Sequence, residues 1–373
     1  MAMRTSPPFR ADHVGSLLRP QQLHAAREEH AADRITDEQL RQVEDDAIRE
    51  VVRLQEQVGL GAATDGEFRR ASWHMDFIYQ LGGISKVMDS TLSVQFRNAD
   101  GVIEFTPPSL HVDSPIHLEQ TIFGDAFRFL SEQVETAVPK LTIPSPSMVH
   151  YRGGRASIDP AVYPELDPFW ADLTAAYAEQ VRRLGELGCR YLQLDDTSLA
   201  YLNDPHQREH AAAIGGDPEH QHEAYIQHMN EALAGRPEGM AVTTHMCRGN
   251  FRSSWVAEGG YDFVAEALFN QLDVDGFFME WDDERSGGFA PLRFLPPGKV
   301  VVLGLITTKR GELERKDDLK RRIDEASQYV DVEQLCLSPQ CGFASTVEGN
   351  ALTLDDELAK LRLVVETAQE VWG

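Results

Sequence analysis

Short apolar segments alternate with longer amphipathic segments along most of this chain, and this alternation constrains the fold most strongly. Helical segments separate most of the strand candidates, so the pattern predicts parallel strands joined by crossover helices. About eight such steps favour one closed (β/α)₈ TIM barrel spanning residues 1–373, with a doubly wound open sheet as the alternative. The strand candidates lie at 13–17, shortly after Gly59, and at 141–144, 191–194, 240–244, 277–279, 300–306 and 335–337.

Two helix boundaries and one insertion complete the expected organisation. Thr36 is followed three residues later by Gln39, a capping-box spacing that predicts a helix start. The last helix is expected from about 354 to 371. Residues 83–135 interrupt the alternation and predict an excursion on the barrel, with a hairpin around Asp100-Gly101 and an exit at Pro107-Pro108.

The composition limits the partners and the compartment. The chain has 35 Lys and Arg against 60 Asp and Glu, a net charge of −25. Because such a surface repels phosphate backbones and anionic membranes, we expect neither a nucleic-acid nor a membrane partner. No apolar run approaches the ~18 residues of a membrane helix or forms a secretory leader. Four cysteines without a leader argue for a reducing compartment, and we expect a cytoplasmic protein.

Polar, chemistry-bearing residues follow the strand candidates. In a barrel, the carboxyl ends of the strands meet at one mouth, where catalytic residues of this fold lie. We therefore expect these residues to gather in one site; they are Glu67, Asp195, His245, Cys247, Glu280 and Cys341.

Four of these residues suit a zinc ion. His245 and Cys247 are two positions apart, so on an extended segment their side chains point to the same side. Cys341 lies in a tight Pro-X-Cys-Gly loop, and Glu280 ends an apolar run, where a carboxylate needs compensation of its charge. Nitrogen and sulfur donors are typical of tetrahedral zinc.

Other interpretations of these four residues stay open. Cys247 and Cys341 could be small buried apolar residues, as we expect for Cys189 and Cys336. His245 could be a hydrogen-bonded core histidine, Glu280 could pair with Arg285, or the zinc could be purely structural.

The motifs together resemble the C-terminal catalytic half of cobalamin-independent methionine synthase, within the uroporphyrinogen-decarboxylase-like barrel superfamily. The resemblance rests on Asp12-His-Val-Gly-Ser-Leu-Leu-Arg-Pro20, His-X-Cys, the glutamate and Pro-X-Cys-Gly, in this order. It implies zinc held by His245, Cys247, Glu280 and Cys341. It further implies that the loop Val14, Gly15 and Ser16 grips an amino-acid thiol whose ammonium group meets Glu67 and Asp195.

The chain departs from that family in two ways. The N-terminal half that helps to bind the polyglutamate tail of folate is missing, and so is the proton-donor histidine after the seventh strand. Lys309 falls near the place of that histidine and is a candidate proton donor or anion ligand. His74 is a second candidate proton donor, and Trp73 is a candidate stacking surface for a flat methyl donor.

These observations predict a zinc-dependent methyltransferase that methylates homocysteine or a related thiol. Two thiolates and a carboxylate leave a zinc site with net charge −1, which favours thiol alkylation over hydrolysis. The donor stays open between methyltetrahydrofolate, a methyl-corrinoid and a small methylated metabolite, and a homo-oligomer or a corrinoid carrier protein stays open as a partner. No glycine-rich dinucleotide fingerprint calls for a flavin or nicotinamide.

Three rival functions remain. An epoxide or alkyl–thiol transferase of the coenzyme M type would need arginines where Glu67 and Asp195 stand. A metal-free enzyme similar to uroporphyrinogen decarboxylase would contain no zinc. A zinc-storing or structural barrel would bind metal without responding to thiols.

Overall fold

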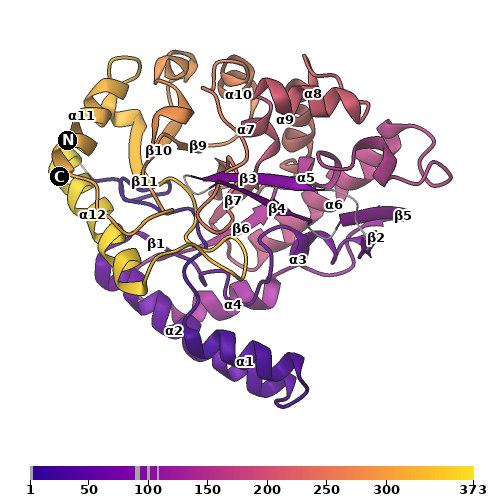
Figure 1. Ribbon diagram of the computed structural model, residues 1–373, viewed down its shortest axis with the longest axis horizontal. Coiled ribbons are helices and arrows are strands. Elements are labelled where there is room, and N and C mark those ends of the chain that lie inside the picture. The colour runs from indigo at the N-terminus through magenta and orange to yellow at the C-terminus, as the bar shows by residue number, and fades with distance from the viewer. Residues whose placement is uncertain (1–2, 89–92, 99–100, 107–108) are drawn as a thin grey trace.

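The predicted barrel is present in the computed structural model, which describes residues 3–88, 93–98, 101–106 and 109–373. Parallel strands form one curled sheet in the order β1-β6-β7-β8-β9-β10-β11, and helices cover its outside (Figure 1). The strands are buried along almost their whole length, as expected for apolar strands covered on both faces. They are β1 (Ala62–Ala63), β6 (Val138–Pro144), β7 (Tyr191–Asp196), β8 (Ala241–Met246), β9 (Gly276–Glu280), β10 (Val300–Ile306) and β11 (Leu335–Pro339).

The eighth position of the barrel is taken by the segment 10–17, between β11 and β1. On one side, Asp12 N–H donates to the Leu337 carbonyl over 3.1 Å. On the other side, Leu17 N–H donates to the Gly66 carbonyl, also over 3.1 Å. These contacts close the barrel and distinguish it from an open sheet.

The prediction of a regular strand at 13–17 is wrong. Only Ala11 forms a bridge, with Leu337. The carbonyl groups that a strand would use bond to side chains: Lys140 Nζ to the His13 carbonyl over 2.6 Å and Gln193 Nε2 to the Val14 carbonyl over 2.7 Å. Gly15, with φ of 147°, then turns the chain out of a strand conformation.

The predicted helix boundaries are confirmed. In α2 the Thr36 hydroxyl accepts from Gln39 N–H and the Gln39 side chain accepts from Thr36 N–H. No helix in the described ranges has both the length and the apolar composition needed to cross a bilayer. The α-helices are α1 (Gln21–Ala31), α2 (Asp37–Val58), α3 (Met75–Ile78), α4 (Gly124–Gln133), α5 (Ser147–His150), α6 (Leu166–Glu186), α7 (Ser198–Tyr201), α8 (Pro205–Ala213), α9 (Gln221–Ala232), α10 (Ala265–Gln271), α11 (Lys316–Ala326) and α12 (Leu354–Trp372), and the 3₁₀ helices are η1 (Gly154–Ser157), η2 (Glu284–Ser286), η3 (Ala290–Phe294) and η4 (Val332–Gln334).

The predicted insertion contains two antiparallel strand pairs, followed by α4. β2 (Gly82–Val87) pairs with β5 (Ser109–His117), and β3 (Val94–Asn98) pairs with β4 (Gly101–Phe105). Asn98 lies opposite Gly101, which confirms the hairpin, whereas Asp100 and the exit at Pro107-Pro108 lie outside the described residues.

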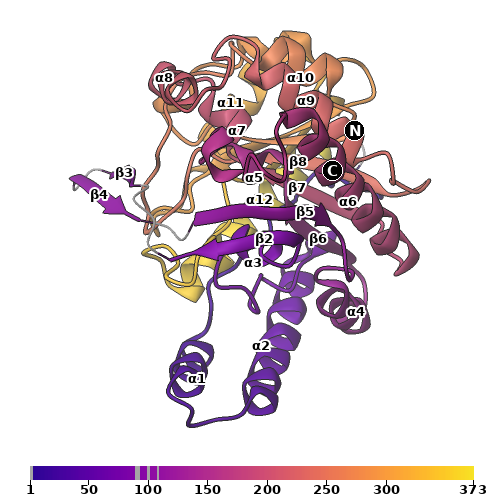
Figure 2. The same cartoon turned by 90° about the vertical axis from the view of Figure 1, so that its right-hand side faces the viewer.

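The β3–β4 hairpin stands away from the helical layer, at the carboxyl-terminal end of the barrel (Figure 2). Arg97 and Trp255 exchange backbone hydrogen bonds of 2.7 and 2.9 Å, and the Phe105 ring stacks on Phe251 with centroids 4.6 Å apart. Because Phe251 and Trp255 belong to the loop that follows β8, the insertion supports the mouth of the barrel.

Candidate metal and substrate site

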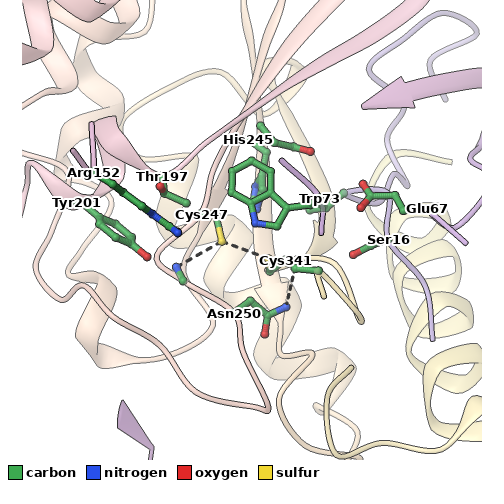
Figure 3. Close-up of a pocket in the computed structure, with 14 residues that line it drawn as sticks. Ser16, Glu67, Trp73, Arg152, Thr197, Tyr201, His245, Cys247, Asn250 and Cys341 are labelled. Carbon is green, nitrogen blue, oxygen red and sulfur yellow. Dashed lines mark hydrogen bonds between the residues drawn. The ribbon is translucent and has the colours of Figure 1, made fainter. Parts of the chain in front are cut away.

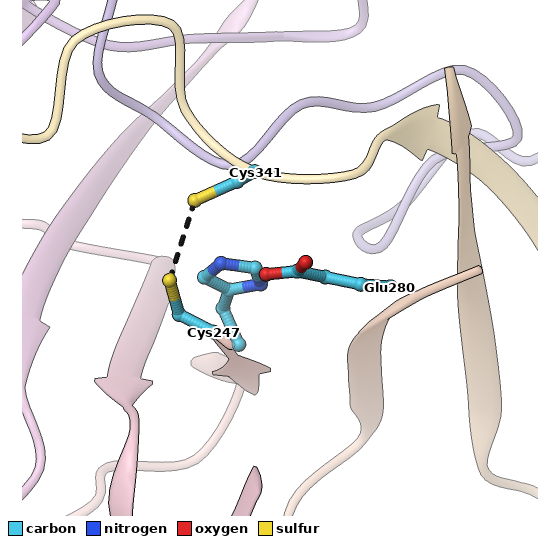
Figure 4. Close-up of side chains that lie close together, drawn as sticks. Cys247, Glu280 and Cys341 are labelled. Carbon is cyan, nitrogen blue, oxygen red and sulfur yellow. Dashed lines mark hydrogen bonds between the residues drawn. The ribbon is translucent and has the colours of Figure 1, made fainter. Parts of the chain in front are cut away.

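The four predicted zinc ligands come together at the mouth of the barrel (Figure 4). His245 lies in β8, Cys247 directly follows that strand, Glu280 ends β9, and Cys341 follows β11. One donor atom from each residue can be chosen so that all lie within 4.8 Å of one another, and all four residues are buried.

The chemistry of these donors fits a metal ion. The two sulfur atoms are 3.5 Å apart. Ligand atoms around tetrahedral zinc would lie about 3.8 Å apart for Zn–S bonds of about 2.3 Å. Apart from the interaction with Cys341, neither ring nitrogen of His245 has a hydrogen-bond partner within the described ranges. These four residues could therefore hold a metal ion.

The alternative partner of Glu280 is present as well. Glu280 Oε2 lies 3.4 Å from an Arg285 guanidinium nitrogen, and Oε1 accepts the Arg248 N–H over 2.9 Å. Arg285 also contacts Asp282 and Asp283, so its charge is shared among three carboxylates. The arginine orients Glu280 without supplying it with a full counter-charge.

The hydrogen bond between the two cysteines makes their pKa values diverge. The hydrogen bond from Cys247 lowers the pKa of Cys341 well below its usual range and raises that of Cys247. Burial opposes protonation of His245, but the interaction with Cys341 and the charges of Asp195 and Glu280 together outweigh it and leave the pKa of His245 raised. Burial also raises the pKa of Glu280. A cation in this position would offset the free-energy cost of burying these donors in their charged forms.

A small cavity adjoins the cluster (Figure 3). It brings together most of the residues expected to bind the amino-acid thiol, whereas Glu280 lies outside its lining. The lining residues are Val14, Ser16, Glu67, Trp73, Arg152, Asp195, Thr197, Tyr201, His245, Cys247, Gly249, Asn250, Cys341 and Ser345.

Glu67 and Asp195 form an acidic pair in this cavity. Glu67 Oε1 accepts the Thr142 hydroxyl over 2.7 Å, while Oε2 has no partner within the described ranges. Burial raises the pKa of both carboxyl groups, and for Asp195, where the charge of nearby Glu67 adds to it, to about 7. A pair of buried carboxylates of this kind suits a cationic group of a ligand.

The loop before the acidic pair approaches it closely. A Cβ atom on Gly15 would lie 2.7 Å from Thr142 Cγ2 and 3.6 Å from Glu67 Oε1. Gly15 therefore lets the loop pass over Thr142, which places Val14 and Ser16 in the cavity lining.

The two candidate proton donors lie outside the lining of this cavity. His74 is buried behind Trp73, with ring centroids 4.4 Å apart, and its Nδ1 lies 3.1 Å from the Ser72 hydroxyl. Lys309 lines a neighbouring cavity with Asp282 and Asp283, and its Nζ has no hydrogen-bond partner within the described part of the chain. Their roles stay predictions.

Sequence reasoning missed several residues of the lining. Thr197 directly follows β7 and fits the predicted pattern, whereas Arg152, Tyr201, Asn250 and Ser345 follow their strands at a distance. The pattern of polar residues directly after a strand does not detect such positions. Asn250 also joins two loops of the site, since its Nδ2 donates to the Gly342 carbonyl over 2.7 Å.

Comparison with known proteins agrees with this geometry. The sequence profile described as "Cobalamin-independent synthase, Catalytic domain" matches residues 9–370. The uncharacterized protein YxjH of Bacillus subtilis is 46% identical over 366 residues, covering 98% of this chain and 95% of that protein. The methionine synthase of Pyrococcus abyssi is 23% identical over 333 residues, covering 88% and 84%.

Solved structures show the same fold. A putative vitamin-B12 independent methionine synthase from Listeria monocytogenes is 39% identical, with a TM-score of 0.78 and 99% of each chain covered. A B12-independent methionine synthase from Shewanella sp. W3-18-1, solved in complex with selenomethionine, is 18% identical, with a TM-score of 0.70 and 97% of each chain covered. The protein described here belongs to the family of cobalamin-independent synthase catalytic domains.

Proposed function

We propose that this protein transfers a methyl group to the sulfur of homocysteine or a closely related amino-acid thiol, with zinc held by His245, Cys247, Glu280 and Cys341. The observation that carries this proposal is that three residues of the candidate metal cluster, His245, Cys247 and Cys341, line one cavity together with a buried acidic pair. Such a cavity suits a molecule with a thiol at one end and an ammonium group at the other. The names of the Pyrococcus and Shewanella relatives support the same activity.

The acidic pair orients the acceptor. Glu67 and Asp195 receive the ammonium group. Arg70, whose guanidinium lies 3.5 Å from Glu67 Oε1, offsets only part of the charge of the pair, since burial still leaves both pKa values raised. The Ser16 hydroxyl lies in the same lining and is suited to the acceptor's carboxylate. This grip fixes the direction in which the sulfur approaches the cluster.

The reaction requires the acceptor as a thiolate. A free thiol with a pKa of ~8.5 is only a few per cent ionised at neutral pH. When bound, zinc supplies the positive charge that stabilises the thiolate form. The acceptor sulfur forms a bond to the methyl carbon while the bond between that carbon and the donor's leaving atom breaks, and the electron pair stays on the leaving atom.

Trp73 is suited to hold the methyl donor. Its side chain is half-buried and lines the cavity beside the cluster, so one indole face can stack on a flat donor. His74 and Lys309 remain the candidates for protonating the leaving atom, each with an unpartnered buried nitrogen among the described residues.

The test is to incubate zinc-loaded protein and homocysteine with a panel of methyl donors and to measure methionine. The panel contains methyltetrahydrofolate, a methyl-corrinoid and small methylated metabolites. Cys247→Ser is expected to lose zinc and methionine formation together, whereas Cys336→Ala, which removes a buried thiol outside the cluster, is expected to keep both. Full activity in zinc-free protein would contradict the proposal, and alkylation of other thiols alone would contradict the choice of homocysteine.

A further inference from the structure

Arg152 brings a cationic side chain into the cavity without a partner. It lies between α5 and η1 and lines the cavity with its half-buried side chain. In the described part of the chain it makes no hydrogen bond or ion pair, although this protein has 60 acidic residues. By contrast, buried Arg70 donates to Thr142, and buried Arg19 donates to the carbonyl groups of Glu67 and Arg70. Those two arginines support the fold, whereas the guanidinium of Arg152 is available to a ligand.

Tyr201 provides a second donor beside Arg152. Its ring is buried at the end of α7, and its hydroxyl has no hydrogen-bond partner among the described residues. Gly249 keeps this hydroxyl accessible: it has φ of 96°, and a Cβ atom there would lie 2.9 Å from Tyr201 Oη. Any larger residue at position 249 would crowd the hydroxyl and strain the backbone.

The two donors lie apart from the acidic pair. Figure 3 shows Arg152 and Tyr201 on one side of the Cys247 sulfur and Glu67 and Ser16 on the other. The acceptor's charged head is already matched by Glu67, Asp195 and Ser16. This leaves the side of Arg152 for a charged group of the second substrate.

We propose that Arg152 and Tyr201 form an anion-binding subsite for an oxyanion of the methyl donor, such as a carboxylate. A guanidinium and a neighbouring hydroxyl are a suitable donor pair for such a group. The subsite also offsets the general repulsion that a chain of net charge −25 exerts on an anionic substrate. This inference rests on the proposed function for the identity of the second substrate.

The experiment compares two probes: 5-methyltetrahydrofolate, whose p-aminobenzoylglutamate tail carries carboxylates, and 5-methyltetrahydropterin, which lacks the tail. Calorimetry on zinc-loaded protein measures the binding of each. The wild type is expected to prefer the folate. Arg152→Gln is expected to weaken folate binding by about tenfold or more, the contribution of a charge-assisted hydrogen bond, and to leave pterin binding unchanged. Arg152→Lys is expected to restore part of the preference.

Arg252→Gln is the matched control. Arg252 is an exposed arginine in the loop after β8, outside the cavity lining. Its substitution removes the same charge as Arg152→Gln from the same end of the barrel. If it weakens folate binding as much as Arg152→Gln does, the effect is a general one of charge and the subsite is refuted.

Two further results would overturn the inference. One is a wild type that binds the folate no more tightly than the pterin. The other is that Arg152→Gln leaves donor binding unchanged and raises the KM of the acceptor, which is tested with homocysteine and with 2-mercaptoethanesulfonate. That result would mean that Arg152 binds an anionic group of the acceptor. Because binding is measured without turnover, failure of the subsite is distinguishable from failure of methyl transfer, which the methionine assay reports.

Discussion

Asp195→Asn is expected to stabilise the metal-free protein at pH 8 while it weakens binding of the acceptor. Burial raises the pKa of Asp195 from 3.8 to about 7, with a further contribution from the charge of Glu67. The unfolded chain loses this proton near pH 3.8, but the folded chain keeps it until about pH 7. The free energy of unfolding therefore falls as pH rises through this window, and the full penalty applies above it.

The penalty is about 4 kcal/mol, because one pKa unit corresponds to about 1.4 kcal/mol. Asparagine removes the charge and keeps a carbonyl oxygen that can accept the 2.7 Å hydrogen bond from Gln193. The free energy of unfolding of Asp195→Asn, relative to that of the wild type, should increase by roughly 3 kcal/mol between pH 5 and pH 8. For a chain of this length that is about 4 °C in the melting temperature. The same substitution should raise the KM for homocysteine by tenfold or more, since it removes a charge-assisted contact.

Glu357→Gln provides the matched control. Glu357 is a buried carboxylate on α12, outside the cavity, and burial raises its pKa to about 8. It should show a similar pH-dependent gain in melting temperature with an unchanged KM. Melting curves of chelator-treated protein at pH 5 and 8, together with steady-state kinetics of the zinc-loaded protein, provide both readouts. If the melting temperature of Asp195→Asn does not rise relative to that of the wild type between pH 5 and pH 8, the argument that the charged Asp195 side chain destabilises the folded protein is refuted.

Two more substitutions test the shape of the cavity. Gly249→Ala is expected to lower the melting temperature and to weaken donor binding, because φ is 96° and the new Cβ would lie 2.9 Å from Tyr201 Oη. Gly259→Ala is the control: φ is 108°, but no atom would lie nearer than 3.4 Å to the new Cβ, so only stability should change. Equal donor affinity in the two variants would contradict this account. Trp73→Leu is expected to raise the KM of a flat donor about tenfold, which is the scale of one lost stacking contact. The KM of homocysteine should stay unchanged in the same kinetic assay, and a change confined to homocysteine would mean that Trp73 contacts the acceptor instead.

The barrel and the gathering of the four candidate metal ligands were predictable because each depends on a regular pattern. Strands buried on both faces are continuous apolar runs, and in a parallel barrel the residues after such runs must face one mouth. His245, Cys247, Glu280 and Cys341 each stand at or just after a strand, so the order of the chain places them together.

The missed features depend on contacts that no periodicity reports. The segment 13–17 has the composition of a strand, but its carbonyl groups accept hydrogen bonds from the side chains of Lys140 and Gln193, which lie far along the chain. Arg152 and Tyr201 enter the cavity from short helical turns after β6 and β7. Their positions follow from the course of the loops, which local sequence determines only weakly.

Gly304 shows how a residue that binds nothing can still determine the site. β10 lies between β9 and β11, so Glu280 and Cys341 must approach each other across it. A Cβ atom at Gly304 would lie 2.7 Å from Gln340 Cα and 2.9 Å from the Met279 carbonyl oxygen, which belong to the residues just before Cys341 and Glu280. Any side chain there would push the two strand ends apart, and the two donors with them. The narrow separation of the ligands is thus a property of three neighbouring strands, and it depends on a glycine at the centre of the middle one.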